Sequence, residues 1–320
     1  MADLTIPTAA RTSGSTTSMA GSDHRLRAPP ARQGPGPVPA ALVDALALSL
    51  VRRGAGALPG DRPAPGAGSG TELAQLRPYQ LGDDVRQLDP AASARTGEPH
   101  VRLQVPERIL TTWLVLDLSA SMAFGTTDRL KSDVAEGVAG VVGRAATRHG
   151  GRLAVLTAGG PQRVLRPRGG PRARIGLRRL LEEGVAVDGV PDRGLGPVLH
   201  HVARLARQPG FVVIVSDFRG PLDWRRPLRA MRARHRLLAV EIRDPREERL
   251  KAAGRLALVD PETGQLVEVD TSRRQLRERF AAAAAQERAG VAEQLRKGGA
   301  DHVVLSTRGD WLRALGQALR

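Results

Sequence analysis

Apolar runs alternate with segments of helical periodicity over residues 110–320. Two runs, 111–116 and 211–215, carry no charge and are rich in branched apolar side chains, which is typical of strands buried on both faces of a parallel sheet. After each run, apolar residues recur at the spacing of a helix with one buried face. This alternation predicts an α/β fold with a doubly wound, mostly parallel sheet. Further strands are expected at 153–157, 237–242 and 303–305, a hairpin at 256–269, and helices at 39–53, 130–145, 175–181, 198–206, 228–231, 272–297 and at the end of the chain.

The first 108 residues follow other patterns. Residues 1–37 are rich in Ser, Thr, Pro, Gly and Ala without an apolar period, so we expect a disordered tail. Residues 38–108 combine one helix with short alternating segments, which predicts an N-terminal helix and a small β-rich appendage. The α/β domain is then expected to cover residues 109–320.

Both long apolar runs end in an acid. Asp117 follows the first and is continued by Ser119 and Ser121, and Asp217 follows the second. Buried strands of open α/β sheets collect ligands at their carboxyl ends, so the two acids are expected to face one another there. Carboxylate and hydroxyl oxygens are ligands that Mg²⁺ or Mn²⁺ prefers, which makes this a candidate metal site. The alternative for the D-x-S-x-S segment alone is a loop that caps the next helix.

The chain also resembles a known family in several motifs. These motifs are Y-Q-L-G-D-D-V-R at 79–86, V-P-E-R at 105–108, W-L-V-L-D-L-S-A-S-M at 113–122 and V-S-D-F at 215–218. Together they resemble the bacterial domain-of-unknown-function 58 family over residues 42–320. The resemblance implies a von Willebrand factor A-like, Rossmann-like domain and a metal-ion-dependent adhesion site at Asp117, Ser119, Ser121 and Asp217. It also implies association with a MoxR-type AAA+ ATPase.

Two departures from the family pattern affect these expectations. The chain has Leu88-Asp89-Pro90 where the family usually has an aromatic residue after the acid. The threonine that completes the family's metal site is expected near Asp192 and Arg193, where the chain has none. An arginine at that place would repel a divalent cation.

Composition limits the classes of function. No cysteine is present among 320 residues, which excludes disulfides and thiolate chemistry and suits a reducing cytoplasm. We find no apolar stretch long enough for a membrane span and no signal peptide, and we expect a cytoplasmic protein. The net charge of +16 comes from 46 arginines and three lysines, with concentrations at 163–179 and 225–236. A solvated face or an acidic protein partner is favoured over nucleic acid, because no nucleic-acid motif accompanies the arginines.

Enzyme motifs are missing from the sequence. It contains no P-loop, H-E-x-x-H or G-x-S-x-G motif. A dense group of charges, Asp83, Asp84, Arg86, Asp89 and Arg95, is expected either to form an ion-pair network that holds the appendage or to contact a partner. We therefore expect a non-enzymatic protein-binding module with an adhesion-type metal site, bound by a MoxR-type ATPase or another acidic protein. The alternatives are metal-dependent hydrolysis by the same oxygens and nucleic-acid binding through arginine.

Overall fold

The computed structural model describes residues 34–55, 73–104, 110–148, 150–186, 194–259 and 265–319. They belong to two units, one within residues 1–60 and 110–320 and the other within residues 61–109. The larger unit is called the main unit below. None of the helices in the described ranges is long and apolar enough to cross a membrane.

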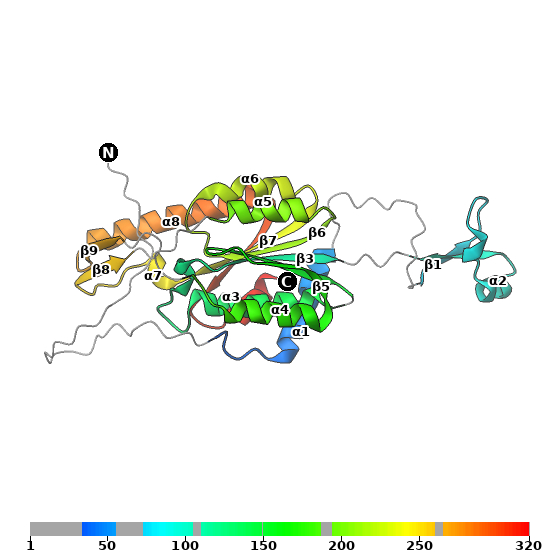
Figure 1. Cartoon of the computed structure of the whole chain (residues 1–320), viewed down its shortest axis with the longest axis horizontal. Coiled ribbons are helices and arrows are strands. Elements are labelled where there is room, and N and C mark those ends of the chain that lie inside the picture. Colours follow the sequence, from blue (N-terminus) through cyan, green and yellow to red (C-terminus); the bar gives the residue numbers. More distant parts are fainter. Residues whose placement is uncertain are drawn as a thin grey trace. The chain divides into compact units, whose positions relative to one another are not determined.

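A six-stranded sheet forms the centre of the main unit (Figure 1). Five strands are parallel, and the edge strand β5 is antiparallel to β4. Taken in chain order, the strands follow the doubly wound order 3-2-1-4-5-6, which reverses between β3 and β6. The side-by-side order is β10 (Ala300–Ser306), β7 (His235–Arg243), β6 (Gly210–Ser216), β3 (Thr111–Asp117), β4 (Arg152–Ala158) and β5 (Val164–Gly169).

Helices cover both faces of this sheet, as Figure 1 shows. Strand β3 serves both cores, because Leu114 and Leu116 point to one face while Trp113 and Val115 point to the other. The predicted α/β, doubly wound and mostly parallel architecture is therefore confirmed. One face carries α1 (Ala40–Ala55), α3 (Lys131–Ala146), α4 (Gly170–Glu182) and α9 (Trp311–Ala318), and the other carries α5 (Gly196–Leu205), α6 (Arg225–Met231) and α8 (Arg274–Lys297).

Two short elements complete the main unit after β7. Helix α7 (Pro245–Glu248) follows that strand directly, and the hairpin of β8 (Arg255–Val259) and β9 (Leu266–Asp270) precedes α8. The hairpin was predicted from its alternating residues and is confirmed. Helix α7 was not predicted, and it carries a residue of the candidate site.

The structure divides the chain differently from the prediction at the N-terminal side. Helix α1 buries Val43, Leu46 and Leu50 in the same core as α3, so it belongs to the main unit and not to an appendage over 38–108. Most of the predicted disordered tail, residues 1–33, lies outside the described residues. Its last part does not fit the prediction, because the Pro35 carbonyl oxygen accepts a hydrogen bond of 2.9 Å from the Trp311 indole nitrogen.

The smaller unit contains the predicted antiparallel strands. Strands β1 (Leu73–Pro78) and β2 (His100–Gln104) pair, and η1 (Val85–Gln87) and α2 (Pro90–Thr96) connect them. Asp83 forms an ion pair of 2.7 Å with Arg77, whereas Asp84 and Asp89 accept hydrogen bonds from backbone amides at the starts of η1 and α2. These carboxylates stabilise the turns of their own unit.

Candidate functional site

The four predicted site residues meet at the carboxyl edge of the sheet, where the strand order reverses. The Ser119 amide donates to Asp117 Oδ1 at 2.9 Å, and the hydroxyls of Ser119 and Ser121 lie 3.1 Å apart. Ser121 Oγ then donates to Asp217 Oδ2 at 2.9 Å. All four residues are at most 4% exposed. The predicted convergence of Asp117, Ser119, Ser121 and Asp217 is confirmed.

A side-chain hydrogen bond and a left-handed turn hold the ends of β3 and β6 together. Ser216 Oγ donates to Asp117 Oδ2 at 2.5 Å and accepts from the Phe218 amide at 2.8 Å. Phe218 has φ 53°, the only positive φ of a non-glycine residue in the described ranges. A left-handed conformation costs such a residue roughly 1–3 kcal/mol, and burial of its ring against Trp224 holds it in place. The turn directs the Arg219 amide to Asp217 Oδ1 at 3.0 Å.

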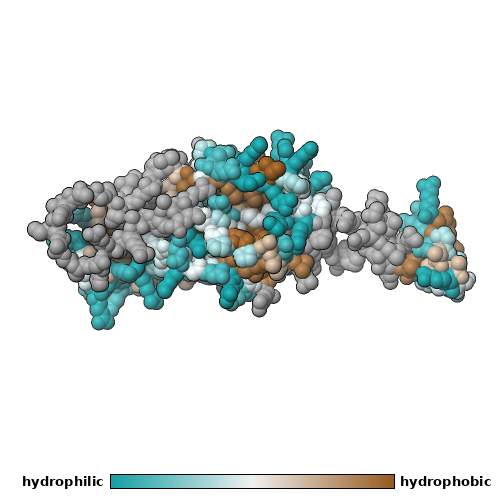
Figure 2. All heavy atoms as spheres, turned by 90° about the horizontal axis from the view of Figure 1, so that it is seen from below, coloured by the Kyte–Doolittle hydropathy of each residue, from teal (hydrophilic) through white to brown (hydrophobic). Residues whose placement is uncertain are grey.

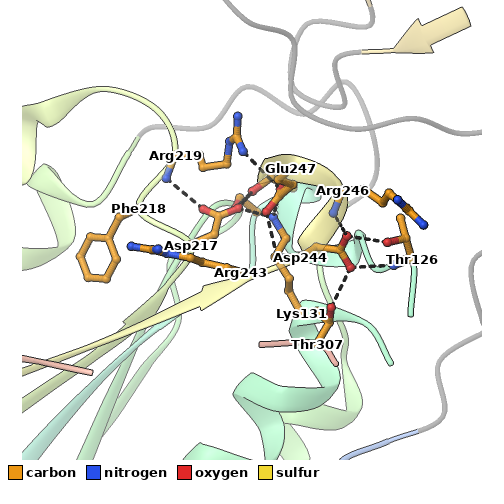
Figure 3. Close-up of polar contacts among 12 residues, drawn as sticks. Thr126, Lys131, Asp217, Phe218, Arg219, Arg243, Asp244, Arg246, Glu247 and Thr307 are labelled. Carbon is orange, nitrogen blue, oxygen red and sulfur yellow. Dashed lines mark hydrogen bonds and ion pairs between the residues drawn. The ribbon is translucent and has the colours of Figure 1, made fainter. Parts of the chain in front are cut away.

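A buried lysine completes this arrangement, and sequence analysis did not identify it. Lys131 is the first residue of α3, and its side chain has no exposed surface. Its Nζ lies 2.6 Å from Asp217 Oδ2 and 2.7 Å from Glu247 Oε1 (Figure 3). A cation is disfavoured at a helix N-terminus and in a protein interior, so the two carboxylates must offset both effects.

Glu247 belongs to α7, whose start is also part of the site. Asp244 follows β7 and caps α7, and the Glu247 carboxylate accepts from the Asp244 amide at 3.2 Å. The Asp244 carboxylate accepts from the hydroxyls of Thr126 and Thr307, at 2.5 and 2.7 Å (Figure 3). Three neighbouring parallel strands, β3, β6 and β7, therefore each end in a buried aspartate.

Arginines enclose the other side of the site. Arg288 of α8 donates from Nη1 to the Asp217 carbonyl oxygen at 2.8 Å and to Glu241 Oε1 at 2.9 Å. Arg243 forms two further hydrogen bonds of 2.9 Å with Glu241. Arg219 Nη1 lies 3.6 Å from Glu247 Oε1, its side chain is 5% exposed, and its Nε has no hydrogen-bond partner among the described residues. The residues of this site are called the edge cluster below. They are Asp117, Ser119, Ser121, Lys131, Asp217, Arg219, Glu241, Arg243, Asp244, Glu247 and Arg288.

Burial and pairing set the ionisation of the cluster. Burial, followed by repulsion from Asp217, raises the pKa of Asp117 to about 6. Burial alone would also raise the pKa of Asp217, but the Lys131 ammonium outweighs it and holds that pKa below its usual value. The pKa of Lys131 is likewise held above its usual value, because attraction to Asp217 and Glu247 outweighs the effect of burial. Lys131 is therefore charged at neutral pH.

The donor chemistry of the four predicted residues suits a divalent cation, but their surroundings do not. A Mg²⁺ ion bound to Asp217 Oδ2 at about 2.1 Å would lie within about 5 Å of the Lys131 ammonium, since that oxygen is itself 2.6 Å from Nζ. No group of three acid or histidine side chains that could hold a metal occurs in the described ranges. Asp192 and Arg193, where the family's threonine is missing, lie outside these ranges. With Lys131 in place, the residues do not fit a divalent cation.

Two signals in the sequence could have identified the missed residues. Lys131 is one of three lysines in a chain with 46 arginines, so a lysine at the start of a helix next to the D-x-S-x-S segment is unusual here. Asp244 also follows a predicted strand, and Asp244-Pro245 followed by Glu247 is the pattern of a capped helix start.

Comparisons with known proteins identify one family and two similar proteins. The family described as "Protein of unknown function DUF58" matches residues 75–290. The chain is 41% identical over 278 residues to the uncharacterized protein Rv1480 of Mycobacterium tuberculosis, covering 85% of this chain and 86% of that protein. It is 42% identical over 142 residues to the uncharacterized protein MAV169 of Mycobacterium avium, covering 44% and 75% of the two chains.

The chain is also similar, at low TM-score, to two solved structures. BatB of Bacteroides thetaiotaomicron has a TM-score of 0.43 and 14% identity, with coverage of 66% of this chain and 97% of that one. The SpRpn10 VWA domain has a TM-score of 0.34 and 13% identity, with coverage of 65% and 94%.

Proposed function

Since the chain belongs to the DUF58 family, whose name assigns no activity, we propose a function from its own site: it is a non-catalytic protein-binding module. It binds an acidic partner at the carboxyl edge of the sheet, next to the edge cluster. This edge at a reversal of strand order is where open α/β sheets bind their ligands.

The observation that carries the proposal is that the cluster's carboxylates are already engaged. Asp117 accepts from the Ser119 amide and the Ser216 hydroxyl. Asp217 accepts from Ser121, Lys131 and the Arg219 amide. A general base must be free to take a proton from a substrate or a water molecule. These carboxylates are held as parts of a rigid support, which favours binding over hydrolysis.

Arginines beside the cluster supply the contact chemistry. Arg246 is half-buried and Arg249 is exposed, and neither side chain forms an ion pair with a described residue. Arg219 adds a buried Nε that donates no hydrogen bond. A buried donor without a partner is uncommon and is satisfied by an incoming acceptor. Carboxylates of an acidic segment are acceptors of this kind, and positive potential at the edge would attract them.

The partner that we propose is the MoxR-type AAA+ ATPase implied by the family resemblance, in the bacterial cytoplasm. Such a module would present a third protein to the ATPase or position it for remodelling. Metal-dependent hydrolysis and nucleic-acid binding through arginine are the competing functions. The binding test described next also distinguishes nucleic-acid binding from the proposed function.

The test measures binding of the purified full chain to the MoxR-type ATPase of the same organism. Arg246→Glu with Arg249→Glu is expected to weaken binding at least about tenfold, or about 1.4 kcal/mol. The matched control is Arg174→Glu with Arg178→Glu, the same change on the exposed surface of α4, which should leave binding within about twofold. Loss of binding only in the control pair would contradict the proposal and move the interface to α4. Preferential binding of DNA or RNA by the unmodified chain would favour the nucleic-acid function.

A further inference from the structure

Lys131 is a fully buried cation at the start of α3, a place where a cation is disfavoured. We infer that Lys131 is the resident cation of the edge cluster: its ammonium group occupies the place at Asp217 that an adhesion-type site gives to a divalent metal. The cluster is then complete without metal. This inference concerns the cation alone and stands whether or not a protein partner binds at the edge.

The contacts of the ammonium support this assignment first. Nζ is bound by Asp217 at 2.6 Å and by Glu247 at 2.7 Å, and all three side chains are at most 2% exposed. Ser121 Oγ donates to the same Asp217 oxygen at 2.9 Å. A metal ligated by that oxygen would have to displace one of these two donors. Displacing Lys131 from Asp217 would leave the buried ammonium with Glu247 alone, next to a doubly charged ion, which is unfavourable.

The charge balance of the cluster is consistent with this assignment. The cluster holds five acids and four side chains that carry positive charge, Lys131, Arg219, Arg243 and Arg288. Four of the acids balance these cations, and Asp117, whose pKa is about 6, adds one negative charge at neutral pH. A divalent ion would change the net charge of the cluster from about −1 to about +1, so it would not make the cluster neutral. Burial favours neutral groups of charges, because an excess of one sign is poorly solvated in the interior.

A lysine and not an arginine at position 131 is consistent with a site that holds a compact cation. Arginine is used at 46 positions in this chain and lysine at three, so the retention of lysine here needs a physical reason. An ammonium group is nearly spherical and binds two carboxylates from different directions, as a small metal ion does, whereas a guanidinium is planar and larger. Lys251 is exposed and Lys297 is half-exposed, so only Lys131 is enclosed in this way.

The first test titrates the unmodified full chain with Mn²⁺ and follows the free ion by electron paramagnetic resonance. We expect no saturable binding up to millimolar concentration. Saturable binding of one ion per chain that is lost on Asp217→Asn would overturn the inference. Because no partner is involved, this result is separate from the outcome of the binding test for the proposed function.

The second test observes the lysines directly. With ¹⁵N-lysine labelling the chain has only three side-chain ammonium groups. An ammonium shielded from water exchanges slowly, so Lys131 should give a ¹H–¹⁵N signal while Lys251 and Lys297 exchange too fast to be seen, and Lys131→Arg should remove it. The signal should be the same with excess Mg²⁺ and with EDTA. A signal that shifts or disappears when Mg²⁺ is added would contradict the inference.

Removing the ammonium should open the site to metal. In Lys131→Ala the carboxylates of Asp217 and Glu247 lose their cation, and Mn²⁺ is expected to bind and to raise the melting temperature. A folded Lys131→Ala protein that binds no Mn²⁺ would show that Lys131 does not occupy the metal's place. If this variant does not fold, the Mn²⁺ titration and the lysine spectrum of the unmodified chain still test the inference.

Discussion

The edge cluster and the arginine face of α4 and β5 both concentrate charge, but they use it in opposite ways. In the edge cluster most of the charges are buried, with Arg243 at 21% side-chain exposure, and each charge meets an ion-pair or hydrogen-bond partner at a defined distance. On the arginine face the side chains are exposed and form no ion pair with a described residue. We define the arginine face by Arg166 and Arg168 of β5 and by Arg172, Arg174, Arg178 and Arg179 of α4.

Different interactions hold the two regions in place. Helix α4 is fixed by Ala173, Leu177 and Leu180, which pack into the core, so its arginines are not needed for its position. The edge cluster is held by its ion pairs and hydrogen bonds, with Phe218 packed against Trp224 beside it. Figure 2 shows how widely hydrophilic groups, in teal, spread over the surface of the main unit. The number of charges in a segment therefore does not indicate their structural role, whereas the burial and pairing of the charges do.

Lys131→Met is expected to cause the largest loss of folding free energy in this comparison of the two regions. Removing one partner of a buried ion pair leaves an uncompensated charge, which costs roughly 3–5 kcal/mol of folding free energy. The matched control is Lys297→Met, which removes an exposed pair with Glu293 and should cost at most about 0.5 kcal/mol. Urea denaturation of both proteins gives the two values. Equal losses would show that the ion pairs of Lys131 do not stabilise the edge.

A second pair of substitutions compares backbone contacts in the two regions. Gly159 has φ +82°, and a Cβ there would overlap the Ser119 backbone, whereas Gly170 has φ +59° and open space around it. Both alanine variants strain the backbone, but only Gly159→Ala also pushes on the edge cluster. The additional overlap is expected to cost roughly 1–3 kcal/mol more than Gly170→Ala, measured by denaturation. Similar losses in the two variants would mean that the loop of Ser119 shifts freely.

The acid sensitivity of folding offers a third comparison. Burial would raise the pKa of Glu241, but hydrogen bonds from His302 and Arg243 and the charge of Arg288 lower it below its usual value of 4.5. A lowered folded-state pKa means that its stabilisation is complete above the unfolded pKa. It is lost as the pH falls through 4.5 towards the folded value.

Glu241→Gln should therefore flatten the loss of stability below pH 4.5, measured by chemical denaturation at several pH values. Glu293 provides the control. Its pKa is also lowered, by Lys297, but its side chain is half-exposed and the pair is screened by solvent, so Glu293→Gln should flatten the profile much less. A larger effect from Glu293 would place the acid sensitivity outside the edge cluster.

The sequence was sufficient to predict the oxygens of the site but not its cation. Asp117 and Asp217 end uncharged strands, and parallel strands bring their carboxyl ends to one edge, so local pattern and topology together predicted their meeting. Lys131 contacts partners 86 and 116 residues away, and one of them lies on a four-residue helix. No periodicity encodes such a pairing, because it depends on the packing of α3, β6 and α7.

Strand β5 was not predicted, and it shows a second limit of predicting secondary structure from the residue pattern. Its sequence V-L-R-P-R-G is charged and contains a proline, which is unusual in a strand interior. It lies at the edge of the sheet, where one side faces solvent and both arginine and proline are tolerated. Pairing with β4 holds it in place, and that pairing is a tertiary contact with no signal in its own residues.

The smallest effect on folding is expected from the arginine face itself. Arg174→Gln with Arg178→Gln removes two exposed charges that have no described partner, and the loss of folding free energy should stay within about 0.5 kcal/mol. The change in urea midpoint measures it, with Lys131→Met as the contrasting value. Relief of repulsion among neighbouring arginines would even give a small gain, and that gain should vanish in high salt because exposed charges are screened. A loss of more than 1 kcal/mol, about twice that limit, would mean that the arginines take part in packing, and the contrast between a paired buried cluster and a solvated face would fail.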